Sequence, residues 1–234
     1  MGKAVAAAAG DDPEVKVAAG VDLGDSLEEG LEKSDAVIDF TLPTFTEELI
    51  EGCVASGRIL VMGTTGHDEH QLRSIEEASK RIPIVHAPNF SVGVNTLFWL
   101  TRRTSEILGD SFDLEVVEMH HRHKKDAPSG TARRLAEILA ETRSLSYQDD
   151  CRHGRHGDVG ARTSGEIGVH ALRGGDVVGD HTVVYAGDGE RVELTHKASS
   201  RLTFAKGAVR AAKWVRNEGH TSGLFDMQDV LGLT

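Results

Sequence analysis

The fold of this chain is decided by residues 36–62, which read AVIDFTLPTFTEELIEGCVASGRILVM. Two short apolar runs, Ala36 to Phe40 and Ile59 to Met62, flank a segment whose apolar residues recur at helical spacing: Leu49, Ile50, Cys53 and Val54. An order of strand, helix and strand is typical of a parallel sheet, because the helix returns the chain to the edge where the first strand began. We therefore predict an α/β fold.

The same alternation extends on both sides of this stretch. Apolar runs at Val15 to Val21 and at Ile82 to Ala87 are predicted to be strands, and the spacing of Leu72, Ile75 and Ala78 predicts a helix between the last two strands. A long helix is expected from Val92 to Leu108. Residues 1–90 are thus predicted to form a Rossmann-like, dinucleotide-binding domain with a parallel sheet.

The second half of the chain has a different pattern, with several strands and few helices. A single clear helix is expected at Gly130 to Thr142, and Gln148 to Ser164 is expected to be a polar loop. This order predicts a mainly antiparallel α+β domain over residues 91–202, with a final helix, Thr203 to Asn217, that returns residues 203–234 to the first domain. The predicted strands are Phe112 to Met119, Glu166 to Leu172, Val177 to Ala186 and Arg191 to Ala198.

Composition excludes several classes of protein. The chain has 234 residues, of which 39% are hydrophobic and 27% charged, so disordered, collagen-like and coiled-coil chains are excluded. No apolar run approaches the roughly 18 residues of a membrane span, and no leader sequence is recognisable at the N-terminus. The 2 cysteines, Cys53 and Cys151, lack the spacing of a metal site or a disulfide scaffold. We expect a cytoplasmic protein with no membrane partner.

The charge pattern points to a small anionic ligand. The formal net charge of −11 disfavours nucleic acid as a partner. Basic residues nevertheless cluster between His120 and Arg134, where their field would attract a small anion.

Three segments that follow predicted strands are candidates for a cofactor site, because ligands of parallel sheets bind beyond the carboxyl ends of the strands. Asp22 is of the type that holds ribose hydroxyls, or is simply a solvated turn residue. Gly63, Thr64 and Thr65 either let a ligand approach the backbone or form a plain tight turn. In the third segment, Asn89 either meets a ligand or caps the next helix. This segment comprises Ala87, Pro88, Asn89 and Phe90.

The segment richest in reactive side chains reads HHRHKKDAPSGT and covers residues 120–131. Its histidines and lysines suit proton delivery near neutral pH, and Ser129, Gly130 and Thr131 would open a helix whose amides attract a carboxylate. A metal site built from the three histidines and a solvated basic loop are the alternatives, and no metal is predicted because no further ligand completes the spacing. Lys197 and Arg201 either face the same anion or hydrate the surface.

With these segments in view, the chain resembles the dihydrodipicolinate reductase family, also called 4-hydroxy-tetrahydrodipicolinate reductases. The resemblance rests on the segments 61–66, 87–95 and 120–132, and it is extended by Arg173 to Gly179, His196 to Arg201 and Ser222 to Met227. It covers most of the chain, and the His-rich segment is its most specific part.

The resemblance implies NADH- or NADPH-dependent reduction of a cyclic dicarboxylate, with loss of water, in lysine and diaminopimelate biosynthesis by a cytoplasmic homotetramer. It implies that His120 donates or accepts a proton and that Lys124 donates one. Substrate would be bound by His121, Gly130 and Thr131. Cofactor would be bound by Asp22, Gly63, Thr64, Thr65, Ala87, Pro88, Asn89 and Phe90.

Two departures from the family pattern generate further expectations. The family opens with a strand and a glycine-rich turn, whereas this sequence begins at what resembles the end of that turn. We therefore hypothesise that Met1 is an internal methionine of a longer reading frame. The connection between Asp22 and Ala36 is also short, and Leu23 stands where a basic residue would pair with a 2′-phosphate, so NADH is expected to be the better cofactor.

Two other functions remain open at this level. One is a related reductase that acts on an amino-acid semialdehyde, although such an enzyme has no need of the His-rich segment. The other is a sensor that binds the dinucleotide without turnover, which the presence of both His120 and Lys124 disfavours.

Overall fold

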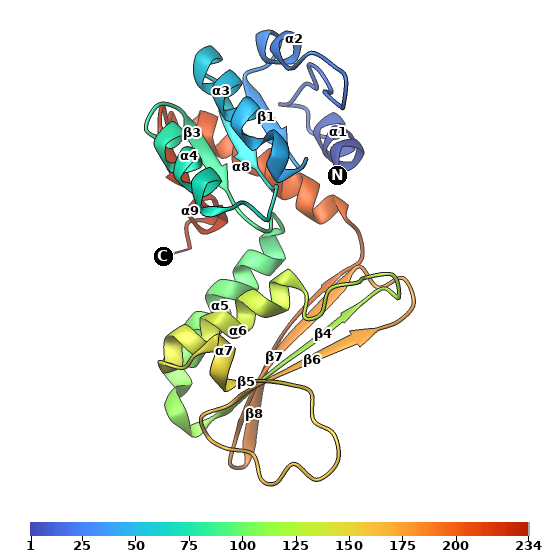
Figure 1. The fold of residues 1–234 in the computed structure, drawn as a ribbon, viewed down its shortest axis with the longest axis vertical. Coiled ribbons are helices and arrows are strands. Elements are labelled where there is room, and N and C mark those ends of the chain that lie inside the picture. The colour runs from blue at the N-terminus through green and yellow to red at the C-terminus, as the bar shows by residue number, and fades with distance from the viewer. Residues whose placement is uncertain (234) are drawn as a thin grey trace. The chain divides into compact units, whose positions relative to one another are not determined.

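The computed structural model describes residues 1–233 and divides the chain into two compact units. The first unit holds residues 1–92 together with the chain from residue 201 onward, and the second holds residues 93–200. Each unit contains one sheet, and Figure 1 labels the helices and strands of both. Among the described residues, no helix is long and apolar enough to cross a membrane.

Sheet A, in the first unit, is parallel throughout, which confirms the predicted Rossmann-like sheet. Its strands follow the order β1 (Ala36–Asp39), β2 (Ile59–Met62), β3 (Pro83–His86) and β9 (Gly223–Phe225). The connecting helices are α3 (Thr46–Ser56), which follows the 3₁₀ turn η1 (Pro43–Phe45), and α4 (Glu69–Ser79). The other helices of this unit are α1 (Gly2–Gly10), α2 (Leu27–Glu32), α8 (Leu202–Glu218) and α9 (Met227–Leu231).

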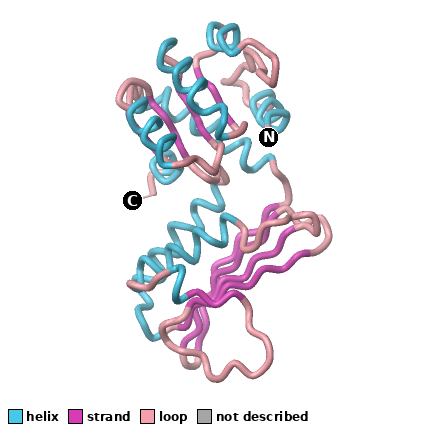
Figure 2. The backbone as a smooth tube through the Cα atoms, viewed as in Figure 1, coloured by secondary structure: helices cyan, strands magenta, loops and turns pink. Residues whose placement is uncertain are grey.

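Helices cover both faces of sheet A, as Figure 2 shows by colour. Leu60 and Met62 of β2 pack with α3 and α4 in one apolar cluster, whereas Val61 packs with α8 and α9 in another. Successive strand residues point to opposite faces, so a strand buried on both faces must be apolar throughout. This requirement explains the continuous apolar run in β2.

The predicted strand from Val15 to Val21 is wrong. These residues form no regular element in the structure, and both Val17 and Val21 are exposed. A strand needs a neighbour to accept and donate its backbone hydrogen bonds. Among the described strands of sheet A, β1 pairs only with β2, so no strand lies beside the run from Val15 to Val21. Its apolar composition alone therefore does not make it a strand.

Sheet B, in the second unit, is mixed. Its strands follow the order β5 (Cys151–His153), β6 (Ile167–Arg173), β4 (Asp113–His120), β7 (Gly179–Gly187) and β8 (Glu190–Ala198). β4 and β5 each run parallel to β6, whereas β7 is antiparallel to both β4 and β8. The α+β class is as predicted, but parallel pairings are as numerous as antiparallel ones. The helices are α5 (Val92–Leu108), α6 (Gly130–Arg143) and α7 (Tyr147–Asp150), with a 3₁₀ turn at η2 (Gly109–Ser111).

One face of sheet B forms the core of the second unit. Alternate residues of β4 are buried, and this inward row runs Leu114, Val116, Glu118 and His120. Its apolar members pack against α5 and α6. Its last two members are polar, so the inner face of the sheet ends in ionisable side chains.

The prediction of a loop from Gln148 to Ser164 is only partly right, because this segment contains the end of α7 and the short strand β5. β5 has 3 residues and pairs with β6. Three residues are too few to show a periodic pattern in the sequence. β5 is a strand because it forms backbone hydrogen bonds with β6, and this pairing cannot be recognised from its own residues.

Candidate functional site

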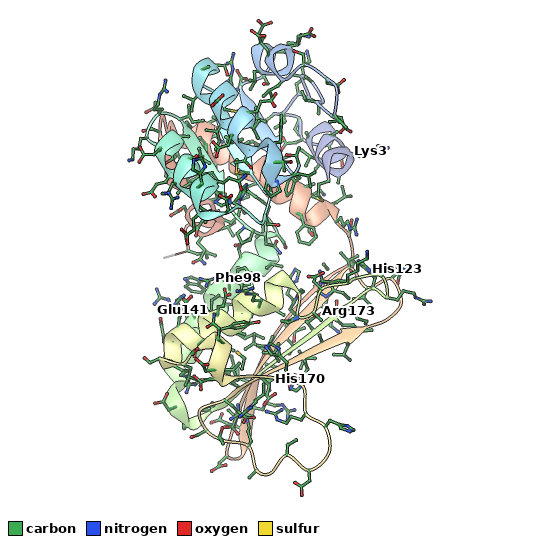
Figure 3. The ribbon with its side chains drawn as sticks, viewed as in Figure 1. Lys3, Phe98, His123, Glu141, His170 and Arg173 are labelled. Atoms are coloured by element: carbon green, nitrogen blue, oxygen red, sulfur yellow. The ribbon has the colours of Figure 1, made fainter. Side chains whose placement is uncertain are left out.

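The candidate site of the second unit lies where three strands of sheet B meet. β4 ends at His120, which pairs in register with Arg173, the last residue of β6. β7 begins beside them at Gly179, where an added Cβ would lie 2.9 Å from Nε2 of His120. Figure 3 labels Arg173 and His123 near this end of the sheet and His170 farther along β6.

Glu118 is the most enclosed charged residue of this site, with a side-chain exposure of 0%. Its Oε2 lies 2.6 Å from Nδ1 of His120 and accepts a 2.8 Å hydrogen bond from Arg173. Its Oε1 accepts hydrogen bonds of 2.9 Å from Arg173 and 3.0 Å from the backbone N–H of Ser129. Burial raises the pKa of Glu118, but the bonds from Arg173, His120 and Ser129 outweigh this effect and lower it below its ordinary value.

Two further histidines continue this cluster across the sheet. His181 stands opposite Glu118 on β7, and His196 stands opposite His181 on β8. The His181 ring meets that of His120 edge-on at 5.1 Å, and its Nε2 lies 3.0 Å from the hydroxyl of Ser129. Burial, assisted by the charge of His120, lowers the pKa of His181 to about 3, so this imidazole is neutral near pH 7.

The N-terminus of α6 is joined to the same cluster through Ser129. The Ser129 hydroxyl caps the helix by accepting a hydrogen bond from the N–H of Ala132, and Gly130 and Thr131 form the first turn. The start of a helix carries partial positive charge and attracts carboxylates. The predicted carboxylate-binding residues Gly130 and Thr131 therefore follow directly after Ser129, whose backbone N–H contacts Glu118.

The loop between β4 and α6 carries the predicted lysine. Nζ of Lys124 lies 2.9 Å from the carboxylate of Asp126, and this contact lowers the pKa of Asp126. The backbone carbonyl of Asp126 accepts a 2.6 Å hydrogen bond from Arg173. His121 is half-buried, and its Nδ1 is enclosed without a hydrogen-bond partner. Arg173 thus ties this loop to the end of sheet B.

Residues 1–233 contain no group of three or more His, Cys, Asp or Glu side chains placed to hold a metal ion. Lys197 and Arg201 are both exposed.

In the first unit, the segment Gly63 to Thr65 follows β2. The Thr64 hydroxyl is buried and donates a 2.6 Å hydrogen bond to Asp39, at the end of β1. A Cβ on Gly63 would lie 2.2 Å from the ring of Phe40, so glycine is required here by the packing of that ring. Thr65 is exposed. The side chain of Thr64 therefore orders the segment, and the neighbouring Thr65 lies at its surface.

The segment Ala87 to Phe90 follows β3 at the same edge of sheet A. The side chain of Asn89 accepts a 2.8 Å hydrogen bond from the N–H of Ser91, just before α5 begins. Phe90 is 1% exposed, and its ring meets that of Phe40 at 5.8 Å. Pro88 is exposed. The buried ring of Phe90 therefore anchors the segment by packing against Phe40, whereas Pro88 lies at the surface of the segment.

Asp22 lies in an exposed turn that precedes α2, and not at the end of a strand as predicted, because the expected strand before it is absent. One oxygen of its carboxylate accepts a 2.8 Å hydrogen bond from the N–H of Leu23. The side chain of Leu23 is 102% exposed.

Comparison with known proteins places the chain in a family. Residues 1–90 match the model described as dihydrodipicolinate reductase, N-terminus, and residues 93–231 match the corresponding C-terminus model. The chain belongs to the dihydrodipicolinate reductase family. This result confirms the resemblance drawn from the sequence, and it makes the chain an oxidoreductase of a family that uses NAD(P)H.

Curated relatives extend this match over the whole chain. The 4-hydroxy-tetrahydrodipicolinate reductase of Akkermansia muciniphila is 56% identical over 234 residues, which are 100% of this chain and 94% of the relative. The enzyme of the same name from Pseudomonas fluorescens is 51% identical over 92% of this chain and 79% of its own length. The dipicolinate-bound dihydrodipicolinate reductase of Paenisporosarcina sp. TG-14 shares the fold, with a TM-score of 0.75 and 24% identity over 98% of this chain and 94% of that one.

Sequence reasoning missed three residues that organise these sites: Asp39, Glu118 and His181. Glu118 carried a readable signal, because it occupies an inward position of a strand whose preceding inward positions are apolar. Asp39 likewise ends an apolar strand. His181 had no such signal, since its contact with Ser129 joins positions 52 residues apart in the chain.

Proposed function

We propose that this chain reduces 4-hydroxy-tetrahydrodipicolinate to tetrahydrodipicolinate with NAD(P)H and with loss of one water, a step of lysine and diaminopimelate biosynthesis. Identity of 56% over the whole chain to an enzyme of this name is the observation that carries the proposal. Such a reduction requires a group that transfers a proton. We assign this role to His120, which contacts the buried carboxylate of Glu118 at the end of sheet B.

The proposed chemistry has a simple balance. NAD(P)H, when bound, supplies the hydride, and the protein must supply one proton and assist the departure of water. The electrons left on the ring are stabilised by a nearby cationic acid, and we assign this role to Lys124, whose ammonium group lies 2.9 Å from Asp126. His120 would exchange a proton through Nε2, because its Nδ1 faces Glu118.

We assign substrate binding to the N-terminus of α6 and its surroundings. Gly130 and Thr131 in the first turn would bind one carboxylate of the substrate, and His121 would also contact the substrate. The partial positive charge of the helix start and the cationic side chains of the preceding loop favour a dianion here.

We assign cofactor binding to the edge of sheet A where β2 and β3 end. Two exposed residues, Thr65 and Pro88, support this assignment because a cofactor could reach them. The segments that carry them are held in place by the buried contacts of Thr64 and Phe90. The remaining proposed cofactor residues are Gly63, Ala87, Asn89 and, for the ribose hydroxyls, Asp22.

We further propose that NADH is preferred over NADPH. Leu23 follows Asp22, and an exposed apolar side chain cannot form an ion pair with a 2′-phosphate, whereas the carboxylate of Asp22 would repel it. The ratio of kcat/KM for NADH and NADPH tests this preference, and equal or reversed values would contradict it.

A homotetramer in the cytoplasm is part of the proposal. The face of sheet B opposite α6 carries half-buried Val117, Met119 and Val184, and Leu172 there is 46% exposed, which favours burial against other copies of the chain. Light scattering after size exclusion should give four times the chain mass of 25.2 kDa. A species of one chain mass would contradict the assembly, and cell fractionation tests the location.

The reaction itself is tested by following NADH and NADPH oxidation while the preceding synthase generates substrate from pyruvate and aspartate semialdehyde. We expect oxidation that depends on the synthase and is lost in His120→Asn. Cofactor binding without oxidation would overturn the proposed reaction and favour a sensor.

A further inference from the structure

We propose that Glu118, paired with Arg173, is a positioning residue that orients His120 and the N-terminus of α6 as one unit. This inference rests on the proposed function in assigning proton transfer to His120. It goes beyond that function by giving a role to two residues that need not touch the substrate.

The carboxylate of Glu118 has no capacity left for other ligands. Each of its oxygens has two partners: Oε1 accepts from Arg173 and from the backbone N–H of Ser129, and Oε2 faces Arg173 and His120. A carboxylate with 0% side-chain exposure requires such full pairing, because burial of an unpaired charge is costly. Its role is therefore to hold its partners.

Glu118 determines which nitrogen of His120 can react. An ionised carboxylate only accepts hydrogen bonds, so Nδ1 of His120, 2.6 Å away, must carry a proton. Nε2 is then the nitrogen that gains or loses a proton. Gly179 lies beside Nε2, and the absence of a Cβ there leaves this nitrogen uncovered on that side.

Glu118 also connects His120 to the proposed carboxylate site. Its Oε1 accepts a hydrogen bond from the backbone N–H of Ser129, the residue that caps α6. Gly130 and Thr131 follow directly, so a shift of Glu118 would move the imidazole and the helix start together. Arg173 connects the loop that carries Lys124 to the same carboxylate, because it also donates a hydrogen bond to the backbone carbonyl of Asp126.

Arg173 holds the carboxylate of Glu118 in the position in which it faces His120. Its two terminal nitrogens donate one hydrogen bond to each oxygen of Glu118, at 2.8 and 2.9 Å. Such a paired arrangement fixes both the position and the plane of a carboxylate. Arg173→Gln removes these two bonds but leaves the carboxylate of Glu118 beside Nδ1 of His120.

The test compares Glu118→Gln and Arg173→Gln with the unmodified chain, and with Glu115→Gln as the matched control. Glu115 lies on the same strand with its side chain on the opposite face, and it also contacts a histidine and two arginines. Nitrogen NMR of the imidazole groups, with His120→Asn for assignment, reports the tautomer of His120 without any need for turnover. The value of kcat provides the second readout.

We expect Glu118→Gln to lower kcat by at least about 10-fold and to mix the His120 tautomers. Arg173→Gln should lower kcat but keep the proton on Nδ1, because the carboxylate of Glu118 remains, and Glu115→Gln should leave both kcat and tautomer unchanged. An unchanged tautomer in Glu118→Gln, or a changed one in Glu115→Gln, would overturn the inference. If Glu118→Gln does not fold, the unmodified chain decides the matter, because a His120 with no proton on Nδ1 also overturns the inference. If the unmodified chain shows no turnover, the proposed reaction is refuted. The inference about Glu118 and Arg173 is then still decided by the NMR result.

Discussion

The hydroxyl of Thr64 donates a 2.6 Å hydrogen bond to Asp39, and this contact joins the ends of β2 and β1. The other oxygen of Asp39 accepts from both the N–H and the hydroxyl of Thr41. One buried carboxylate therefore orders the segments that follow two neighbouring strands. This arrangement gives Asp39 a structural role at the proposed cofactor site.

Asp39→Asn should weaken cofactor binding more than it slows the chemistry. The amide cannot accept all three hydrogen bonds, and the loss of a bond to a charged group, about 1.5 kcal/mol, corresponds to a roughly 10-fold higher KM for NADH. Steady-state kinetics with varied NADH measures this effect. Asp35→Asn is the control, because Asp35 forms only an exposed pair with Arg216. An unchanged KM in Asp39→Asn would refute the role.

Lys124→Ala should lower kcat by about 10²-fold or more, the typical contribution of a positioned proton donor. Binding of NADH, measured by fluorescence titration, should change little, because Lys124 lies in the second unit and the proposed cofactor residues lie in the first. The neighbouring, exposed Lys125 provides the control variant Lys125→Ala. If Lys124→Ala raises only the KM for substrate, then Lys124 positions the substrate and does not donate the proton.

Gly179→Ala should impair proton transfer through a single added methyl group. Its Cβ would lie 2.9 Å from Nε2 of His120, closer than normal packing allows, so the imidazole must move. We expect a lower kcat, with the melting temperature used to check that the fold persists. Gly165→Ala adds the same methyl group where no atom lies within 4 Å, and it should leave kcat unchanged. Equal kcat values for both variants and the unmodified chain would contradict this assignment.

Glu115 should make folding stability depend on pH in the acid range. Burial opposes its ionisation, but hydrogen bonds from Arg155, His170 and Arg162 lower its pKa from 4.5 to about 2. A carboxyl whose pKa is lower in the folded state stabilises the fold above its unfolded pKa, and this stabilisation is lost as the pH falls from about 4.5 to about 2.

Urea unfolding at pH 7 and pH 3 measures this effect. Between these two pH values the loss attributable to Glu115 should be at most about 2 kcal/mol, and Glu115→Gln should show a smaller dependence on pH. Glu48→Gln, at an exposed position of α3, is the control. A pH dependence that is the same in Glu115→Gln and in the unmodified chain would contradict the prediction.

Elements with a long or strongly apolar pattern were predictable from the sequence. The predicted bounds of β2, Ile59 to Met62, and of α5, Val92 to Leu108, agree with the structure. Both depend on local rules, because a doubly buried strand must be apolar throughout and a packed helix repeats its apolar residues at its own period. The family was likewise recognisable, because its specific residues are contiguous in segments such as 120–132.

The sequence by itself therefore determined the fold class, the order of most elements and the family, since these depend on residues close together in the chain. Only the tertiary structure decided that Val15 to Val21 is not a strand, that β5 is one, and that Glu118 meets Arg173, 55 residues away, beside His120. Strand formation requires a partner that supplies backbone hydrogen bonds, and a buried carboxylate requires donors from several elements. Neither requirement can be read from neighbouring residues, because in each case the partner is supplied by a distant part of the chain.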